Sequence, residues 1–439
     1  MQILKFGGTS VGSAGRIASV AALATRERGN IVVLSAMSGT TNSLVEISEY
    51  LYKGNVPGAQ ETLNALETKY RAVVDELFCG DSTAFVRLEP SFRLIRAFFC
   101  EPFGESAEKE ILAQGELMST ALMQECMSRR GIAVGMLPAL DYMRTLDNGE
   151  PDMAHIGTRL RRLLADNPGC DVYLTQGYIC RNSHGGIDNL KRGGSDYTAS
   201  LIGAVTDADE IQIWTDIDGM HNNDPRFVPD TAPVHELHFE EAAELAYFGA
   251  KILHPSCVLP AKLHNIPVRL LNTMEPQAKG TLIFNAPPTG RIKAVAAKDN
   301  ITAIKIKSGR MLLAYGFLHK VFETFENHRT AIDMMATSEV GVSVTVDNDA
   351  RLEAIVDDLK EFATVTVDRD MVIIAVVGDL EWHNRGFETA VLGALSDIPV
   401  RMVSYGGSDY NISVLVRSCD KVKALKALSQ HLFSNQEGA

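Results

Sequence analysis

The stretch ILKFGGTSVG at residues 3–12 combines a short apolar run, a lysine and two adjacent glycines. Ile3–Phe6 predicts a buried strand, and Gly7 and Gly8 predict a tight turn into the following helix. Free backbone N–H groups at the start of a helix bind anions, and Lys5 adds a positive charge at the end of the strand. The stretch therefore predicts a strand, a turn and a helix that together bind phosphate.

Three other interpretations compete with this one, and the first two of them fit the sequence poorly. Gly7 and Gly12 have the spacing of a Walker A loop, although Ser13 stands where that loop has lysine. Residues 8–12 match the nucleophile elbow of hydrolases, but an elbow takes an oxyanion donor from an earlier strand–helix loop, and almost no chain precedes this one. The third interpretation is an ordinary strand–helix turn that binds no ligand.

On the C-terminal side of this stretch, β-branched runs alternate with helical patterns up to about residue 285. Helices are expected at Ser106–Arg129 and Tyr197–Thr206. Alternating strands and helices predict an α/β fold with a mostly parallel central sheet between layers of helices, and ligands of such folds bind at the carboxyl ends of the strands. The expected strands are Ile3–Phe6, Ile31–Leu34, Val172–Leu174, Ile211–Trp214 and Val268–Leu271.

The pattern changes at Asn285–Gly290, where two prolines and a glycine predict a linker. Beyond it, the order strand, helix, strand, strand occurs twice, with a repeat of about 70 residues. We therefore expect an α/β domain at residues 1–285 and two α+β repeats at 300–366 and 367–439. The expected strands and helix starts are Ile301–Ile306, Gly316, Ala331–Thr337 and Val340–Val346 in the first repeat, and Met371–Val377, Gly386, Val400–Tyr405 and Asn411–Val416 in the second.

The pentapeptide GGSDY occurs at Gly193–Tyr197 and again at Gly406–Tyr410. The first copy precedes an expected helix, so its N–H groups and the helix dipole favour an anion. The second copy precedes the alternating strand Asn411–Val416, so its Gly and Asp residues suit a turn between strands. The two copies are therefore expected to have different roles.

Several polar residues follow expected strands or interrupt an expected helix. Ser35 and Thr41 lie in a Ser- and Thr-rich segment that suits hydrogen bonds to a small polar substrate, or capping of the next helix. Glu116 lies in an apolar helix and is either exposed or buried beside a cation such as a substrate ammonium. Arg192 suits a carboxylate or a phosphate, and Asp196 suits an N-cap or a partner for Lys5.

The segment 214–226 follows an expected strand and is rich in polar residues. Asp216 and Asp218 resemble the start of a calcium loop whose remaining ligands are missing, and His235 and His238 are one residue too close for the HExxH zinc motif. No resident metal site is therefore predicted. A nucleotide-binding loop fits this segment better, with Lys251 as a second lysine for phosphate.

Composition excludes several classes of protein. The chain has 439 residues, 46% of them apolar, and its formal net charge of −13 argues against a nucleic-acid partner. The longest apolar run, near Val372–Val377, is far too short to span a membrane. The N-terminal MQILKFGGTS has no secretory pattern, and seven cysteines without CxxC spacing predict reduced thiols, so we expect a cytoplasmic protein.

Five motifs follow one another along the chain: KFGGTSV at 5–11, GELMST at 115–120, RGGSDYTA at 192–199, WTDIDG with DPR at 214–226, and FGAKILHP at 248–255. Together they resemble the aspartate kinases (aspartokinases) of the amino acid kinase superfamily, and the tail resembles the two ACT domains of the monofunctional lysine-sensitive type. The resemblance covers essentially the whole chain. It implies ATP-dependent phosphorylation of the side-chain carboxylate of L-aspartate to 4-phospho-L-aspartate, the first step towards lysine, threonine and methionine.

The resemblance also implies partners and site residues. Mg²⁺ would arrive with the co-substrate ATP, and the ACT-like repeats would form a homodimer or larger assembly and bind an amino-acid effector. Lysine is favoured over threonine because Asp333 or Glu339 can receive an ε-ammonium. Lys5 would stabilise the transferring phosphoryl group, and Asp196 would orient Lys5. ATP would bind at Lys5, Gly7, Gly8, Ser10, Thr215, Asp216, His221, Arg226 and Lys251; aspartate at Ser35, Thr41, Glu116, Arg192, Gly193, Gly194 and Ser195; and the effector at Met311, Gly316, Phe317, Leu318, Asp333, Ser338 and Glu339.

The sequence departs from the family pattern at two places. His221 stands where the family commonly has tyrosine, and Gly186–Lys191 replaces a Thr-rich run. Two other hypotheses compete with an aspartate kinase. A kinase of glutamate or of a nucleotide gives no reason for the paired C-terminal repeats, and an inactive amino-acid sensor gives no reason for Lys5 and Lys251.

Overall fold

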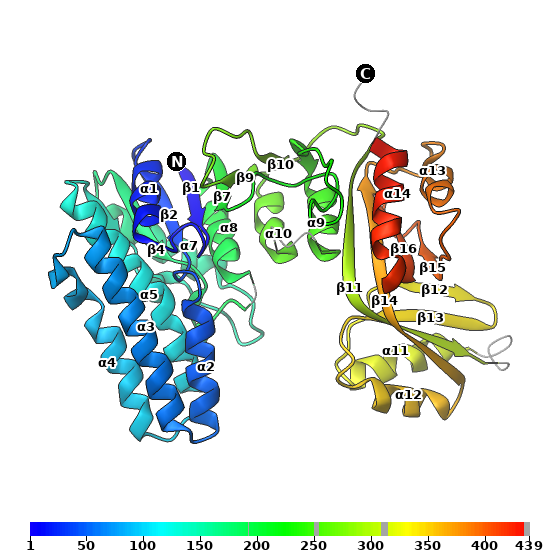
Figure 1. Ribbon diagram of the computed structural model, residues 1–439, viewed down its shortest axis with the longest axis horizontal. Helices are drawn as coiled ribbons and strands as arrows, with labels where there is room; N and C mark the ends of the chain where they lie inside the picture. Colours follow the sequence, from blue (N-terminus) through cyan, green and yellow to red (C-terminus); the bar gives the residue numbers. More distant parts are fainter. Residues whose placement is uncertain (192, 250–253, 309–314, 434–439) are drawn as a thin grey trace. The chain divides into compact units, whose positions relative to one another are not determined.

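The computed structural model describes residues 1–191, 193–249, 254–308 and 315–433. This part of the chain forms two compact units (Figure 1). The N-terminal unit contains Met1–Gly219 and Ile252–Asn285. The C-terminal unit contains Met220–Lys251 and Ala286–Ala439. The segment 220–251 therefore packs with the C-terminal repeats, and the chain returns to the N-terminal unit after it.

A mostly parallel sheet forms the centre of the N-terminal unit. In spatial order, its strands within this unit are β3 (Val134–Met136), β4 (Val172–Gln176), β2 (Asn30–Leu34), β1 (Gln2–Phe6), β7 (Glu210–Thr215), β9 (Val268–Asn272) and β10 (Thr281–Phe284). Neighbouring strands are parallel except β10, which is antiparallel to β9. Every residue of β2 is buried, as expected for a central strand with both faces covered. A separate hairpin consists of β5 (Ile179–Arg181) and β6 (Ile187–Asn189).

Helices cover both faces of this sheet. One face packs against a layer made of α1 (Ala14–Ala24), α2 (Thr40–Tyr52), α3 (Val56–Leu77), α4 (Glu89–Ala97) and α5 (Glu105–Arg129), where Leu4, Phe6 and Leu34 join the apolar core. The other face packs against α8 (Gly194–Thr206), which has α7 (Met153–Asp166) and α10 (Pro255–Leu263) beside it. Shorter elements are η1 (Ser82–Arg87), η2 (Phe98–Cys100) and α6 (Ala139–Tyr142).

An antiparallel sheet of six strands forms the centre of the C-terminal unit. In spatial order, the strands are β12 (Met335–Ser338), β13 (Gly341–Val346), β11 (Ile292–Lys307), β14 (Thr364–Gly378), β16 (Asn411–Arg417) and β15 (Met402–Ser404). Helices α11 (Phe317–Asn327) and α12 (Leu352–Lys360) share an apolar core with β11 and β13. Helices α13 (Phe387–Ala394) and α14 (Lys421–Phe433) share another with β14 and β16. The remaining elements are β8 (Glu236–His238), α9 (Phe239–Tyr247) and η4 (Ser418–Asp420).

The structure confirms the α/β fold followed by antiparallel α+β repeats, and the five strands expected before residue 285 are present. The first GGSDY starts α8, and the second lies in the turn between β15 and β16, as predicted. The strand expected at Ala331–Thr337 begins only at Met335. The backbone N–H of Asp333 donates to the carbonyl of Thr345 in β13, and the N–H of Thr345 donates to the carbonyl of Met334. Two consecutive residues therefore lie opposite one residue of β13, which interrupts the regular ladder of hydrogen bonds.

Candidate active site

The carboxyl ends of three neighbouring strands meet at one edge of the N-terminal sheet. In the sheet register, Lys5 of β1 lies between Val33 of β2 and Ile213 of β7. Ser35 directly follows β2, and Thr215 is the last residue of β7. Parallel strands end on the same side of a sheet, so these three polar residues come together although they are far apart in the sequence.

Lys5 forms an ion pair with Asp196 at this edge. Ser195 and Asp196 lie in the first turn of α8, and the side chains of Lys5 and Asp196 are only 10% and 13% exposed. An ammonium paired in this way is held in one position at the end of β1. In the same turn of α8 the N–H groups of Ser195 and Asp196 make no backbone hydrogen bond to a described residue, so the edge carries the two kinds of group that bind phosphate oxygens.

Glycines allow the backbone to approach closely around this edge. A Cβ on Gly8 would lie 2.7 Å from the carbonyl oxygen of Ala36, and the N–H of Gly7 donates to the carbonyl of Trp214 at 3.1 Å. Gly193 precedes α8 with a φ of +74°, and a Cβ there would lie 2.4 Å from the Cβ of His254. Gly194 is similarly close to a tyrosine ring, with 2.7 Å to its Cδ2. Side chains at these positions would push the turn and the helix away from the strand ends.

Glu116 is buried near the end of β2, with 4% of its surface exposed. Its Oε1 accepts a hydrogen bond of 3.2 Å from the N–H of Ala36. Gly115 lets α5 come this close, because a Cβ at that position would lie 2.8 Å from the Cβ of Ala36. Burial raises the pKa of Glu116 to about 8, although the Ala36 N–H opposes the shift. Glu116 is therefore buried and not exposed. In the described ranges no basic side chain pairs with this carboxylate, so a cationic group would be a favourable partner.

Other predicted residues of the N-terminal unit have different surroundings. The Ser10 hydroxyl is fully buried, lies 2.7 Å from the Thr273 hydroxyl and donates to the Trp214 carbonyl at 3.3 Å. It therefore holds the turn after β1 against the ends of β7 and β9. Thr41 is exposed in the first turn of α2, and Asp216 is exposed directly after β7.

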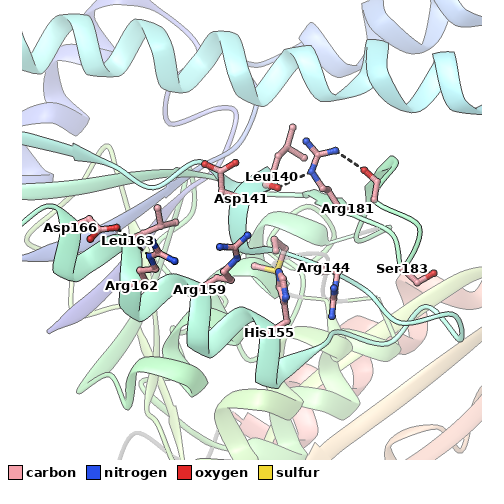
Figure 2. Close-up of a pocket in the computed structure, with 12 residues that line it drawn as sticks. Leu140, Asp141, Arg144, His155, Arg159, Arg162, Leu163, Asp166, Arg181 and Ser183 are labelled. Atoms are coloured by element: carbon pink, nitrogen blue, oxygen red, sulfur yellow. Dashed lines mark hydrogen bonds and ion pairs between the residues drawn. The ribbon is translucent and has the colours of Figure 1, made fainter.

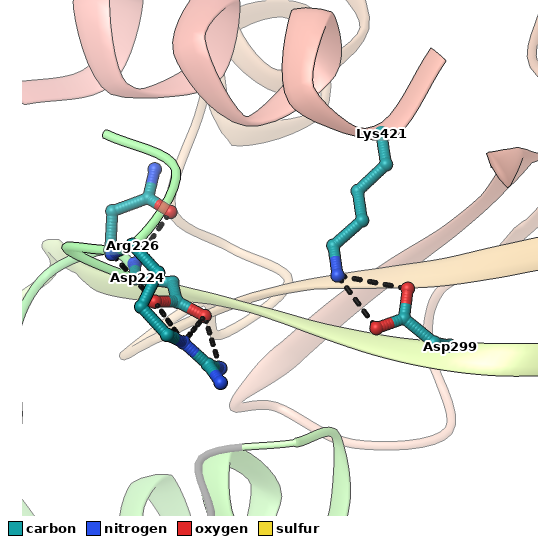
Figure 3. A network of polar contacts seen from close by, with 5 residues as sticks. Asp224, Arg226, Asp299 and Lys421 are labelled. Carbon is teal, nitrogen blue, oxygen red and sulfur yellow. Dashed lines mark hydrogen bonds and ion pairs between the residues drawn. The ribbon is translucent and has the colours of Figure 1, made fainter. Parts of the chain in front are cut away.

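Two residues predicted to bind ATP, His221 and Arg226, lie in the C-terminal unit. Nδ1 of His221 lies 2.8 Å from the hydroxyl of Thr231. The Arg226 guanidinium donates to both carboxylate oxygens of Asp224 at 2.6–3.1 Å and remains 68% exposed (Figure 3). Asp224 therefore holds Arg226 on a solvent-facing loop.

The loop that carries Arg226 is attached to helix α14. The side-chain amide of Asn223 donates to the carbonyl of Leu425 at 3.0 Å. Nζ of Lys421 lies 4.2 Å above the ring of Phe227 and donates to both oxygens of Asp299 at 2.7 and 2.9 Å (Figure 3). These contacts pack the loop against the second repeat.

The described residues among those predicted to bind the effector lie in two segments of the first repeat, at the start of α11 and in or beside β12. Gly316 has a φ of +88° and precedes α11, whose first residue, Phe317, packs edge-on against Phe362. Leu318 is exposed on the same helix. Ser338 ends β12 and donates to the carbonyl of Gly341 at 3.4 Å, and the next residue, Glu339, is exposed.

Asp333 already has a lysine beside it. Its side chain is 2% exposed, and Oδ1 accepts from Nζ of Lys298 at 2.6 Å and from the Tyr247 hydroxyl at 3.1 Å. Lys298 also contacts Asp347 at 2.9 Å. Burial raises the pKa of Asp333, and Lys298 opposes that shift. Among the described residues no group bonds Oδ2, so this carboxylate can accept one more donor.

Three predicted site residues, Arg192, Lys251 and Met311, lie outside the described residues. Sequence reasoning, for its part, missed Lys69, Tyr247 and Lys298. Lys69 of α3 donates to the carbonyl of Ser38 in the Ser- and Thr-rich segment, and burial lowers its pKa. No local motif marks these residues, because each acts on a partner more than 30 positions away.

None of the helices in the described ranges is long and apolar enough to cross a membrane. Within the same ranges, no three His, Cys, Asp or Glu side chains are grouped as they would be to hold a metal ion.

Comparison with known proteins gives consistent matches. The amino acid kinase family matches residues 1–272, and the ACT domain family matches residues 374–432. Lysine-sensitive aspartokinase 3 of Escherichia coli is 32% identical over 98% of this chain and 99% of its own length, and chloroplastic aspartokinase 1 of Arabidopsis thaliana is 32% identical over 99% of this chain and 80% of its own length.

Solved structures agree with the sequence matches. E. coli aspartokinase III in complex with aspartate and ADP (R-state) superposes with a TM-score of 0.86 at 32% identity, covering 99% of this chain and 100% of that one. The same enzyme with lysine and aspartate (T-state) has a TM-score of 0.76 at 33% identity, with 99% of both chains covered. The chain therefore belongs to the aspartokinases of the amino acid kinase family and carries a C-terminal ACT domain.

Proposed function

We propose that this aspartate kinase transfers the γ-phosphoryl group of ATP to the side-chain carboxylate of L-aspartate, with Lys5 stabilising the charge on the transferring group. The observation that supports this most directly is the buried Lys5–Asp196 ion pair at the end of β1, between the Gly7–Gly8 turn and the start of α8. Phosphoryl transfer depends on positioning and on positive charge more than on a covalent nucleophile. The chemistry of this edge fits that requirement.

Glu116 and Arg192 would bind aspartate. The buried Glu116 carboxylate accepts from the N–H of Ala36, the residue that follows Ser35. It would receive the α-ammonium of the substrate. Arg192, next to the Gly193 turn, would receive a carboxylate. The related E. coli enzyme has been solved in complex with aspartate and ADP, which supports an amino acid and a nucleotide as joint ligands of such a site.

The residues predicted to bind the nucleotide are divided between the two units. Lys5, Gly7 and Gly8 would bind phosphate oxygens, with Ser10 holding their turn in place. Arg226 would leave its exposed pairing with Asp224 for the nucleotide, with Lys251 as the second lysine. Mg²⁺ would be carried by ATP and would neutralise charge on its β- and γ-phosphates.

Feedback inhibition by lysine would act through the first ACT-like repeat. Asp333 supports this choice, because one of its oxygens is paired with Lys298 and the other is buried without a hydrogen-bond partner among the described residues. An effector ε-ammonium at Oδ2 would satisfy that oxygen. The related E. coli enzyme has been solved in complex with lysine. We also predict that the protein forms a homodimer through these repeats and that it is cytoplasmic.

The proposed reaction is tested by trapping its product. An acyl phosphate reacts with hydroxylamine, so purified protein with ATP, Mg²⁺ and L-aspartate should form aspartyl hydroxamate in step with ADP. L-Glutamate and D-aspartate in place of L-aspartate are the matched controls and should give little product. ATP hydrolysis without hydroxamate, or equal product from glutamate, would contradict the proposal.

A further inference from the structure

A cleft in the N-terminal unit lies apart from all the residues predicted to bind ATP, aspartate or the effector. It has a volume of about 480 Å³ and is lined by α6, α7, the end of β5 and the turn that follows (Figure 2). This volume is within the range of roughly 300–1,000 Å³ that is typical of small-molecule sites. The site residues described above contribute nothing to its lining.

The lining of this cleft has an excess of positive charge. Four arginines and two aspartates line it, in a chain whose formal net charge is −13. A local excess of this kind in an acidic protein creates a positive potential that attracts anions. The arginines are Arg144, Arg159, Arg162 and Arg181, and the aspartates are Asp141 and Asp166.

Protein contacts hold two of these guanidinium groups in place without using all their donors. Arg181 donates from Nε to the carbonyl of Leu140 at 3.0 Å and from Nη1 to the carbonyl of Gly185 at 2.6 Å (Figure 2). Arg144 donates from Nε and Nη2 to Asp152. Nη2 of Arg181 and Nη1 of Arg144 make no hydrogen bond to any described residue, so each fixed group offers a donor to a ligand.

Arg159 is a third donor, and it lies one turn along α7 from His155. The Arg159 guanidinium has neither a hydrogen bond nor an ion pair with the described part of the chain. The pKa of His155 is lowered, first by burial and then by the positive charge of Arg144; Asp152 opposes the shift and Arg159 adds to it. An anion placed among these groups would remove their mutual repulsion.

The cleft also has an apolar wall. Met143 is 1% exposed, Leu163 is half-buried, and both line the same space as the arginines, together with Leu140. A ligand that fills the cleft would therefore place a charged group on the arginines and an uncharged body on these side chains. One guanidinium can bind both oxygens of a carboxylate with two parallel hydrogen bonds. Guanidinium groups from three separate parts of the chain therefore suit an anion with more terminal oxygens, such as a phosphate.

We propose that this cleft binds a small molecule that carries a phosphate group on an apolar body, with Arg144, Arg159 and Arg181 holding the phosphate. The site is separate from the kinase site and does not depend on how ATP and aspartate bind.

The test is calorimetric titration of the full-length protein with inorganic phosphate and with phenyl phosphate. ADP, Mg²⁺ and L-aspartate are present at saturation so that the kinase site is occupied. Arg159→Glu reverses the charge of the unpaired arginine, and Arg159→Lys keeps the charge but removes the fork. The matched control is Arg26→Glu, which reverses another exposed arginine whose side chain has no hydrogen bond or ion pair with the described residues.

We expect one phenyl phosphate per chain, bound more tightly than inorganic phosphate because of the apolar wall. Arg159→Glu should weaken binding roughly tenfold or more, because it removes charge-assisted hydrogen bonds to the phosphate. Arg159→Lys should weaken it less, and Arg26→Glu hardly at all. The proposal is overturned if wild-type protein takes up neither probe at millimolar concentration. It is also overturned if Arg26→Glu weakens binding as much as Arg159→Glu, which would indicate attraction by overall charge only.

Discussion

Lys5 and Asp196 show what a single contact contributes at the residue scale. Their ion pair is almost completely buried at the end of β1 and the start of α8. Little water screens the positive charge of Lys5 there, so its electrostatic interactions are stronger than on the surface. We expect Lys5→Ala to lower kcat by about 10²–10³-fold, the usual effect of removing an electrostatic stabiliser of a transition state. The measurement is the hydroxamate assay, with circular dichroism to check the fold.

Lys53→Ala is the matched control, because this lysine has an exposed ion pair with Glu49 outside the site. Its kcat should equal that of the wild type. Near-normal turnover of a natively folded Lys5→Ala protein would contradict the role we assign to Lys5.

Glu116 predicts a dependence on pH. Its pKa in the folded protein is about 8, above the ordinary value of 4.5, so folding favours the protonated form. Any stability that Glu116 contributes is present below pH 4.5 and is lost as the pH rises towards 8. Glu116→Gln keeps an acceptor for the Ala36 N–H and has no charge to bury. We therefore expect its melting temperature to equal that of the wild type near pH 4.5 and to exceed it near pH 8.

The same substitution should weaken aspartate binding. An ammonium ligand needs the deprotonated Glu116, so the wild-type KM for aspartate should fall as the pH rises from 6 to 8. In Glu116→Gln this KM should be roughly ten- to a hundredfold higher and independent of pH, since a charge-assisted hydrogen bond is lost. The KM for ATP should change little. Equal changes in both KM values, or a lower melting temperature at every pH with an unchanged aspartate KM, would count against this role.

At the scale of elements, glycines decide how closely the turn after β1 approaches the end of β2. A Cβ on Gly8 would lie 2.7 Å from the carbonyl oxygen of Ala36, whereas a Cβ on Gly15 in α1 would meet no atom within 4 Å. Gly8→Ala should therefore destabilise the protein by about 1–3 kcal/mol, as overpacking does, and lower activity by displacing Lys5. Gly15→Ala should stabilise it by about 0.4–1 kcal/mol. Chemical denaturation of both variants checks the opposite signs, and a shift of the same sign in both would refute the packing explanation.

At the scale of the whole molecule, regulation requires two states that lysine binds with different affinity. The contact of Asp333 with Lys298 and Tyr247 joins the first repeat to α9, which precedes Lys251 in the chain. We expect Asp333→Asn and Ser338→Leu to abolish inhibition by lysine while threonine stays without effect. Lys298→Met should lower the lysine concentration needed for inhibition, because it removes a positive charge that repels an ε-ammonium at Asp333.

These effects are measured by titrating lysine and threonine against the activity of each variant, with the melting temperature as a check on folding. Wild-type activity that lysine does not reduce at millimolar concentration would contradict the choice of effector. Lysine inhibition that is unchanged in Asp333→Asn would contradict the position of its site.

Much of the architecture could be predicted from local patterns. Five strands of the N-terminal sheet, the repeat after residue 290 and the different positions of the two GGSDY copies follow from periodicity and from the residues next to each segment. Helix α3 could have been predicted in the same way, because its buried Leu63, Leu66, Tyr70 and Val73 have helical spacing. These features depend on residues that are neighbours in the chain, so the sequence by itself determined them.

Only the tertiary structure decided which polar groups pair. It brings Ala36 to Glu116, turns the Ser10 hydroxyl towards Thr273 and places Lys298 on Asp333. It also packs residues 220–251 with the C-terminal repeats although the strands on either side of them belong to the N-terminal sheet. These pairings join positions that are up to hundreds of residues apart, and their free energy depends on register, burial and close packing. A local pattern contains none of these quantities, because they exist only once the chain is folded.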